Sequence, residues 1–548
     1  MDDFSFVGDP AECLVAFERL RRLARERGVE VHPDSCLQVP RGEPSEALAG
    51  AAAAQGLRVV RGNTDYLGGA LGLDDAGLEA WVREKLAALS PVERAITDDD
   101  LPALHAVRFA KMNLHPMPTY ISRALPFRVS AGPVGEFGDR VRDAVLRRLH
   151  LPQPLPDSAI ISLSQPSRNG GMGMRSWRSV GPAAKFASAA IVAPDLLPFA
   201  AVSPPLPFVR DRDHCYALLV RGGVEVQGYG DDDAADHKAP SDDPHACTHY
   251  TLPADPADIA THFQGECRVR GLQRSLTKQL DDHALQRFRT SLSCAPLDRV
   301  RLSCCSRSRD QPVLGAWFSS TAQTLNDQHC RVAVRLRLGL PPLPSLPVAR
   351  ICPLCELNLA DDPWHALSCQ RLKRLSIFSR HELIVLLLIQ FFNSNGFLAR
   401  ALKKSRSDKL PDVEVHLPGE TIFLDVSGTH PLNPSYLDRT LSNLSAALDY
   451  RANSKASKYG GWAAERNGRF VPFVLDSFGR LQREALDLLD LVAATTVSLA
   501  LSPTRMSLPT LRSMLSSQWQ RGNGLIVCEW AIMCRDKLSR HLPLRSFS

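Results

Sequence analysis

The sequence predicts a multidomain α/β protein, with a mostly helical N-terminal part and a small sheet near the C-terminus. Its 548 residues suffice for two to four domains of ordinary size. Apolar residues recur at helical spacing over most of 76–200 and 255–338, whereas residues 413–417 alternate as a short strand does and residues 422–426 form an apolar strand. A proline-rich run at 340–347 separates the two regions and predicts a stiff linker, the clearest domain boundary in the chain.

Composition places the chain among soluble globular proteins, with 44% hydrophobic and 23% charged residues. The N-terminus carries no apolar secretory segment, and the longest apolar stretch, Leu383 to Phe392, is too short to cross a bilayer. We therefore expect no membrane partner and a buried core helix at that stretch. The 14 cysteines are expected to be reduced thiols.

The net charge of +6 is modest, but the basic residues are grouped. One group runs from Arg268 to Arg309 and another from Arg371 to Lys409. Such stripes follow a phosphate backbone in some proteins and form a solvated face in others, so both interpretations stay open.

In the N-terminal part we expect a strand at 4–8, a helix from Glu12 to Arg27 ended by Gly28, and a strand at 29–31 stopped by Pro33. Residues 66–72 predict a tight strand-turn. Helices broken by prolines follow to about residue 200. The acidic, turn-rich segment 228–248 predicts an exposed or disordered insert.

Four metal-ligating side chains follow the proline-rich run. Cys352 and Cys355 are separated by two residues, His365 comes after nine more, and Cys369 after three more. This spacing can close two thiols, an imidazole and a third thiol around one Zn²⁺. The sequence therefore predicts a structural zinc site.

Two carboxylates are set into the predicted hairpin beyond it. Asp412 opens the alternating strand 413–417, residues 418–420 form a turn, and Asp425 lies within the apolar strand 422–426. A carboxylate inside a buried strand is costly unless it is paired or metal-bound. We expect Asp412 and Asp425 to bind Mg²⁺ or Mn²⁺, with the backbone carbonyl of Val426 as a further ligand.

A helix from Leu437 to Tyr459 and a strand at 470–475 are expected next. Lys455 on this helix could lean over the strands to orient an attacking water, and Tyr459 shares its helical face. The order of helix 381–394, hairpin, helix and strand is that of the PD-(D/E)xK nuclease core.

Residues 345–480 resemble the C-terminal part of non-LTR retrotransposon proteins that carry a restriction-enzyme-like endonuclease. The resemblance rests on the Cys-Cys-His-Cys group, Arg380-His381-Glu382, Pro411-Asp412-x12-Asp425, Pro434-Ser435-Tyr436 and Lys455-x3-Tyr459. It implies Glu382 as an extra metal ligand. Ser427 stands where the simplest form of the motif has Lys, so the resemblance assigns the lysine role to Lys455.

The N-terminus is similar to the end of a reverse transcriptase palm. Met1-Asp2-Asp3 resembles the x-Asp-Asp hairpin, which implies Asp2 and Asp3 as Mg²⁺ ligands for nucleotidyl transfer. Residues 28–33 and 67–72 resemble the next palm motif and the primer-grip turn. Lys111-Met112-Asn113, with Tyr120, Arg123 and Pro126, resembles the thumb region, and Gly170–Ser176 resembles the Gly-rich segment after it. We expect a polymerase half that is incomplete and inactive alone.

The resemblance implies a series of segments: 1–75 partial palm, 76–227 helical thumb-like region, 228–248 insert, 249–339 basic helical connector, 340–347 linker, 348–375 zinc knuckle, 376–480 nuclease and 481–548 C-terminal helical segment. It also implies a nuclear protein that nicks target DNA to prime reverse transcription of the element RNA. The residues expected to contact nucleic acid are Arg371, Lys373, Arg374, Arg380, His381, Lys403 and Lys404. Two alternatives remain: a catalytically inactive nucleic-acid-binding remnant, and a cellular repair or restriction nuclease.

Overall fold

The computed structural model describes residues 9–28, 36–39, 44–61, 64–66, 69–71, 74–200, 207–227, 250–263, 271–291, 295–306, 325–342, 351–359, 362–372, 375–402, 410–498 and 505–541. Most of these residues are helical, and four strands near the C-terminus form a mixed sheet. This architecture is compatible with the predicted multidomain α/β class.

The chain divides into two compact units, and neither is a continuous stretch of sequence. Unit 1 comprises 1–93, 115–141 and 176–280, and unit 2 comprises 94–114, 142–175 and 281–548. The segment 76–227, expected as one thumb-like region, is thus divided between both units.

Unit 1 begins with a small α/β element and continues as packed helices. Strand β1 (Cys36–Val39) pairs in parallel with β2 (Arg58–Arg61), beside helices α1 (Pro10–Glu26) and α2 (Glu46–Ala54). Asp9 caps α1 by accepting hydrogen bonds from the N–H groups of Ala11 and Glu12. Strand β3 (Thr64–Tyr66) pairs antiparallel with β4 (Gly69–Leu71), as the strand-turn prediction requires.

The rest of unit 1 is helical. Its helices are α3 (Asp75–Ala87), α4 (Ser90–Thr97), α6 (Pro118–Ala124), α7 (Phe127–Arg148), α9 (Trp177–Ala200), α10 (Pro207–Arg221), η2 (Pro256–Asp258), α11 (Ile259–His262) and α13 (Leu272–Thr290). Helices α6, α10 and α11 pack against α9. Helices α4, α7 and α13 each continue into unit 2. The core here joins α9, α10, α11 and α13.

Unit 2 contains a helical part and the sheet. The helical part consists of α5 (Ala103–Phe109), the π-helical turn η1 (Ala110–Leu114), α8 (Asp157–Ser164), α14 (Pro296–Cys305) and α15 (Asp327–Leu338). Gly339 ends α15 with a left-handed backbone at φ 74°. A side chain there would also collide with Arg301, because an added Cβ would lie 2.6 Å from its Nε.

The sheet has the order β5 (Leu398–Ala401), β6 (Val413–Leu417), β7 (Glu420–Thr429) and β8 (Gly468–Asp476). Strands β5, β6 and β7 are antiparallel, whereas β8 is parallel to β7 after a crossover through α17 (Pro434–Ser442) and α18 (Ala446–Ala464). The hairpin predicted at 413–426 is therefore confirmed.

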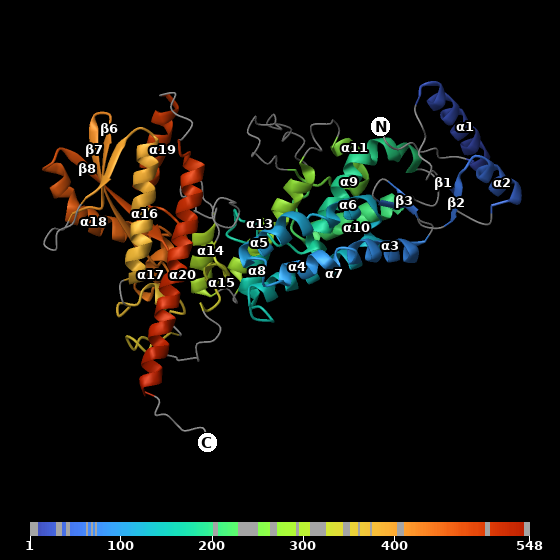
Figure 1. The fold of residues 1–548 in the computed structure, drawn as a ribbon. Coiled ribbons are helices and arrows are strands. Elements are labelled where there is room, and N and C mark those ends of the chain that lie inside the picture. The colour runs from blue at the N-terminus through green and yellow to red at the C-terminus, as the bar shows by residue number, and fades with distance from the viewer. Residues whose placement is uncertain are drawn as a thin grey trace, which may run out of the picture. The chain divides into compact units, whose positions relative to one another are not determined.

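Helices cover both faces of this sheet (Figure 1). Helices α16 (Leu375–Ser394), α19 (Arg483–Ser498) and α20 (Leu508–His541) share one core with Val413, Leu424 and Phe473. Leu448 and Ala452 of α18 pack on the opposite face, against Val474. The C-terminal segment 481–548, expected as separate, thus contributes α19 and α20 to the sheet's core.

Two of the predicted helices differ from the structure in their bounds. The single helix expected from Leu437 to Tyr459 is two helices, because Asn443 is extended and its side chain accepts a hydrogen bond from the N–H of Ser445. Helix α16 is longer than its apolar stretch. By length and composition it is the one described helix that could cross a membrane, with 39% of its most apolar window buried. Here that buried side belongs to the core of the sheet.

Several expectations fall outside the described residues: the strands at 4–8 and 29–31, Asp2 and Asp3, the insert 228–248 and the linker beyond Pro342. The described cysteines form no disulfide, in agreement with the expectation of reduced thiols.

Candidate functional sites

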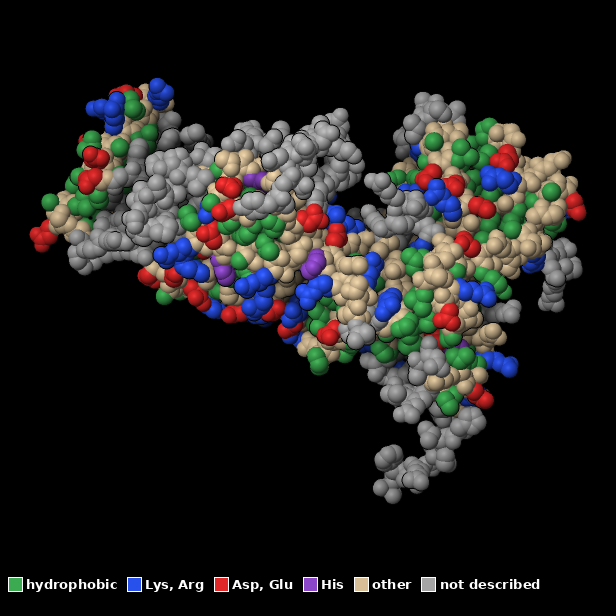
Figure 2. Space-filling view, turned by 180° about the vertical axis from the view of Figure 1, so that it is seen from behind, with side chains coloured by type: hydrophobic (Ala, Val, Ile, Leu, Met, Phe, Trp, Pro, Cys, Tyr) green, Lys and Arg blue, Asp and Glu red, His purple; other side chains and the backbone are tan. Residues whose placement is uncertain are grey.

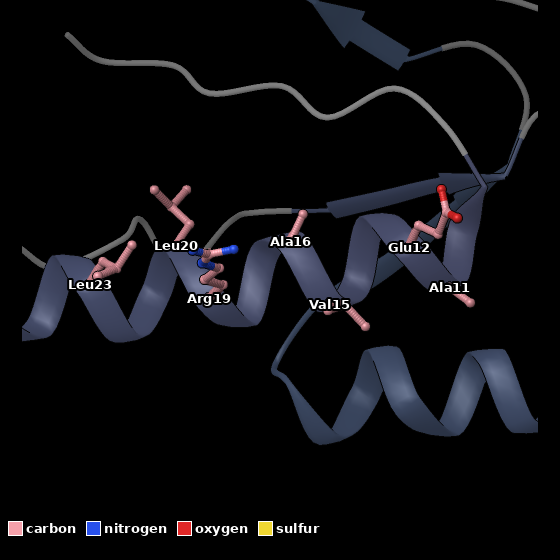
Figure 3. A pocket seen from close by; sticks show the side chains of 7 residues that line it. All are labelled: Ala11, Glu12, Val15, Ala16, Arg19, Leu20 and Leu23. Carbon is pink, nitrogen blue, oxygen red and sulfur yellow. The ribbon is translucent and has the colours of Figure 1, made fainter.

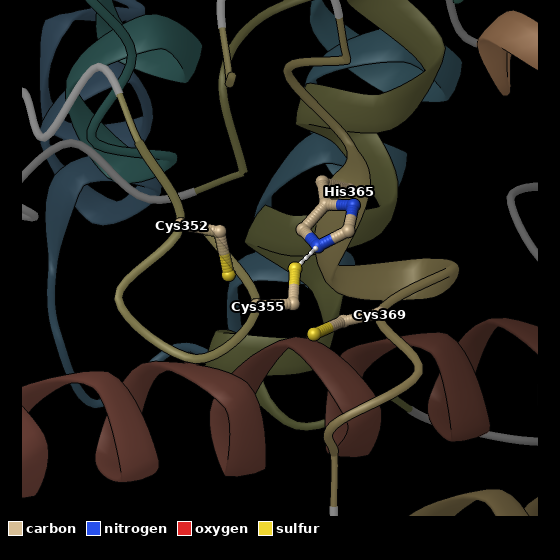
Figure 4. A group of neighbouring side chains, drawn as sticks. All are labelled: Cys352, Cys355, His365 and Cys369. Atoms are coloured by element: carbon tan, nitrogen blue, oxygen red, sulfur yellow. Dashed lines mark hydrogen bonds between the residues drawn. The ribbon is translucent and has the colours of Figure 1, made fainter. Parts of the chain in front are cut away.

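The predicted zinc ligands come together in unit 2 (Figure 4). The N–H of Cys352 bonds the carbonyl of Leu357 at 2.7 Å, and Glu356 has a left-handed backbone at φ 66°, so the chain turns back tightly just after Cys355. His365 lies on the short helix η4 (His365–Leu367). The four ligand atoms lie within 4.8 Å of one another, with Cys355 Sγ 2.9 Å from His365 Nε2.

The thiols of this group are electrostatically unequal. Burial raises the pKa of Cys352, but hydrogen bonds from the backbone N–H groups of Cys355 and Leu354 outweigh it and lower that pKa to about 7. Burial and the neighbouring Cys352 and Cys355 raise the pKa of Cys369 to about 12. A divalent cation among the thiols would stabilise all the thiolates together.

A buried carboxylate lies behind the imidazole of His365. Asp362 Oδ2 lies 3.8 Å from His365 Nδ1, and Asp362 also accepts hydrogen bonds from the N–H of Trp364 and the hydroxyl of Ser368, both at 3.1 Å. Burial lowers the pKa of His365, but Asp362 and Cys352 outweigh burial and raise it. A carboxylate behind a ligating histidine is the usual support of a zinc site. The group can therefore hold a metal ion such as Zn²⁺.

Helix α20 closes the other side of this group. Its Trp530 and Cys534 are buried in the same core as Cys352 and Cys369. The sequence analysis missed both residues, since more than 150 positions separate them from Cys369.

The two predicted carboxylates lie on neighbouring strands of the hairpin. Asp412 directly precedes β6, and Asp425 lies within β7, the strand paired with β6. The N–H of Asp412 bonds the carbonyl of Leu424, the residue before Asp425, at 2.7 Å. Both aspartates are buried, at 4% and 2% exposure. Val426 contributes its N–H, which donates to Asp412 Oδ2 at 2.7 Å.

Lys455 reaches this pair from α18. Its Nζ lies 2.6 Å from Asp425 Oδ2, a buried oxygen that accepts no hydrogen bond of ordinary geometry. Tyr459, one turn further, is buried beneath the lysines: Lys455 Nζ lies 5.7 Å from its ring centre, and Lys458 donates to its hydroxyl at 2.6 Å. Ser427, at the usual lysine position, has a buried hydroxyl without a hydrogen-bond partner.

His381 links α16 to Asp412. Its Nε2 lies 2.8 Å from Asp412 Oδ2, and its Nδ1 lies 3.2 Å from Glu382 Oε1. Burial lowers the pKa of His381, but Asp412 and Glu382 outweigh burial and raise it. Glu382 thus contacts the carboxylate pair through His381. Within the described parts of the chain, no third His, Cys, Asp or Glu completes a ligand group with Asp412 and Asp425.

The expected nucleic-acid contacts are only partly on the surface. Arg380 is a correction: it is buried, stacks on Trp519 at 4.1 Å from the ring centre and donates to Asn523 at 2.7 Å. Arg371 is exposed. Lys373, Arg374, Lys403 and Lys404 lie outside the described residues.

Several described basic residues elsewhere form ion pairs. On the face seen in Figure 2, Lys and Arg lie interspersed with Asp and Glu and form no continuous basic patch. Arg83 pairs with Glu136 and Arg140 with Glu93 in unit 1. In the expected basic connector, Arg301 is buried and bonds Asp298 and the carbonyl of Arg337.

An open groove of about 620 Å³ lies along α1 in unit 1 (Figure 3). Its lining is mostly apolar. The lining residues are Ala11, Glu12, Val15, Ala16, Arg19, Leu20 and Leu23. None of the predicted site residues lies there.

No family model matches this sequence, and comparison with curated proteins gives no match.

Proposed function

We propose that this protein is a metal-dependent DNA endonuclease of the PD-(D/E)xK type, carried by a retroelement reverse transcriptase protein. The observation that supports it most is the ion pair of Lys455 with Asp425, 2.6 Å apart, next to Val426, whose N–H donates to Asp412. Two carboxylates and a lysine are what phosphodiester hydrolysis by this route needs. The lysine comes from a neighbouring helix instead of the strand.

The carboxylate pair fits a hard divalent cation. Asp425 Oδ2 is a buried acceptor with Lys455 as its nearest counter-charge, and Asp412 is held by the N–H of Val426. Mg²⁺ or Mn²⁺ held by Asp412 and Asp425 would activate water and neutralise charge on the scissile phosphate.

The chain's own residues have separate roles in this proposal. Lys455, which lies next to Asp425, orients the attacking water and offsets the negative charge of the scissile phosphate. His381 keeps Asp412 in position, and Glu382 holds His381. The zinc group supplies structure, and Arg371 beside it lies on the surface where nucleic acid could be bound.

A supercoiled plasmid tests this function. The full chain should nick it when Mg²⁺ or Mn²⁺ is present, and Asp425→Asn should lower the rate by about 100-fold or more, since both metal binding and the lysine pair are lost. Lys455→Met should slow nicking by about 10²–10⁴-fold, in the range of a lost proton-transfer or positioning group. Asp438→Asn, an exposed acid on α17, is the matched control.

The alternative is a nucleic-acid-binding protein without cleavage. The buried hydroxyl of Ser427 at the usual lysine position favours it. It predicts salt-sensitive DNA or RNA binding by the wild type, with no nicking in either metal. Equal nicking by wild type and Asp425→Asn would instead remove the assigned site.

A further inference from the structure

A series of buried polar groups in unit 2 leads from the zinc ligands to the carboxylate pair. It begins at Asp362, which is 1% exposed. One carboxylate oxygen lies 3.8 Å from His365 Nδ1, and the other lies 3.8 Å from His430 Nε2. Both separations are longer than a hydrogen bond, so the carboxylate lies between two imidazoles without a hydrogen bond to either.

His430 connects Asp362 to the ends of two strands. It directly follows β7, and Ser477 directly follows β8, the strand paired with β7. His430 Nδ1 lies 2.7 Å from Ser477 Oγ, whereas Nε2 is buried without a hydrogen-bond partner. One side of the imidazole is thus fixed to the sheet, and the other side faces Asp362.

The path continues from Ser477 into the helices. The Ser477 carbonyl accepts a hydrogen bond from Asn523 Nδ2 at 2.9 Å. Asn523 Oδ1 accepts one from Arg380 at 2.7 Å. Arg380 precedes His381, which holds Asp412 at 2.8 Å.

Because of this arrangement, zinc binding at the Cys/His group should affect the local stability of the sheet. Without a cation, Asp362 is a buried carboxylate close to His365, and a buried charge is costly in a low-dielectric interior. Zn²⁺ would balance this charge and fix His365. The resulting stabilisation would extend to the hydrogen bonds that hold the ends of β7 and β8 and the start of α16.

We propose that Asp362, His430 and Ser477 are positioning residues that couple zinc binding at Cys352, Cys355, His365 and Cys369 to the order of the carboxylate-bearing sheet and α16. This coupling rests on the metal-binding capacity of the Cys/His group and is independent of whether the protein cleaves DNA. It gives the zinc site a role beyond holding its own loop.

Hydrogen–deuterium exchange of the full chain, zinc-loaded and zinc-stripped, tests the coupling. In the wild type, removing zinc should speed exchange by about tenfold or more in peptides from 420–430, 468–480 and 375–394. Peptides from α9 in unit 1 should change little. Unchanged exchange in the sheet and α16 after zinc removal would overturn the proposal.

Two serine variants test whether the coupling between the zinc site and α16 passes through Ser477. Ser477→Ala should keep the visible spectrum of Co²⁺ bound to the thiols, yet its α16 peptides should no longer respond to the metal. Ser162→Ala, which removes another buried hydroxyl hydrogen bond in unit 2, should respond like the wild type. A wild-type response in Ser477→Ala would show that the coupling does not pass through this residue and would sink the assignment.

A second measurement uses zinc affinity. Asp362→Asn should weaken zinc binding by about 10–100-fold in competition with a coloured chelator, as loss of a supporting carboxylate does. Asp281→Asn, a buried acid paired with Arg175, should keep the wild-type affinity. Equal affinities for both variants would contradict the role of Asp362. Neither measurement depends on cleavage, so the coupling and the nuclease can fail separately.

Discussion

Lys111 is a half-buried lysine whose charge should affect the pH dependence of the free energy of unfolding. It lies on the π-helical turn η1 and donates to Ser167 Oγ at 3.2 Å. Burial, together with the like charges of Arg337 and Arg175, lowers its pKa to about 8. The unfolded chain keeps this proton up to its ordinary pKa of 10.5 and so binds more protons between the two values. The free energy of unfolding should therefore rise with pH from about 8 to 10.5.

Urea denaturation at pH 7.5 and pH 10 measures this effect. The shift corresponds to an energy on the order of 3 kcal/mol, so the gain at high pH should be measurable against other titrations. Lys111→Met should remove the gain attributable to this residue. Lys278→Met, on α13, should keep the wild-type slope, and an unchanged slope in Lys111→Met would show that the lysine is not desolvated as the structure has it.

At the same scale, sequence reasoning found the residues that obey local patterns and missed those that do not. Asp412, Asp425 and Lys455 could be predicted because strand alternation and helical spacing fix which way each side chain points. The prediction that Arg380 contacts nucleic acid was wrong, because the local sequence does not distinguish an arginine buried against Trp519 from an exposed one. Asp362 carried a signal, its position three residues before His365, whereas His430 reaches it only through the fold.

At the level of elements, alanine substitutions at two glycine pairs in long helices should have opposite effects on stability. Gly522 and Gly524 lie within α20 where a Cβ would come within 2.2 Å of Arg380 and 2.5 Å of His329. Gly460 and Gly461 lie in α18 with nothing within 4 Å. Gly522→Ala should destabilise by about 1–3 kcal/mol through overpacking, despite the better helix propensity of Ala. Gly460→Ala should stabilise by about 0.5–1 kcal/mol. Thermal unfolding of both variants checks the signs, and stabilisation by both would mean that α20 does not pack closely on α16.

Elements whose cause is local were predictable, and those set by packing were not. The hairpin of β6 and β7 follows from alternation and a turn at Gly419, where φ is 79°. The break between α17 and α18 depends on one side-chain hydrogen bond of Asn443, which competes weakly with helical periodicity. The packing of α20 on α16 pairs positions more than 140 residues apart, and no local pattern announces it.

At the level of the whole molecule, the core of unit 2 includes residues on both sides of the proline-rich run 340–347. One hydrophobic core joins α14 and α15, which precede the run, to the zinc group and α20, which follow it. Val300, Cys304, Val332 and Leu336 are buried there against residues that include Trp530. A cut near residue 345 would therefore expose apolar surface on α20 and around the zinc ligands.

This arrangement predicts an order of stability among fragments. Residues 345–548 should unfold at lower urea concentration than 281–548, which keeps α14 and α15, and both should unfold before unit 2 does in the full chain, which adds 94–114 and 142–175. Each buried Val or Leu that is lost removes about 1.5–3 kcal/mol, enough to separate the midpoints clearly. Zinc content measured on the same samples should follow the same order, because Cys352 and Cys369 share this core. Equal midpoints for 345–548 and 281–548 would restore the proline-rich run as a true domain boundary and make α15 dispensable to the zinc group.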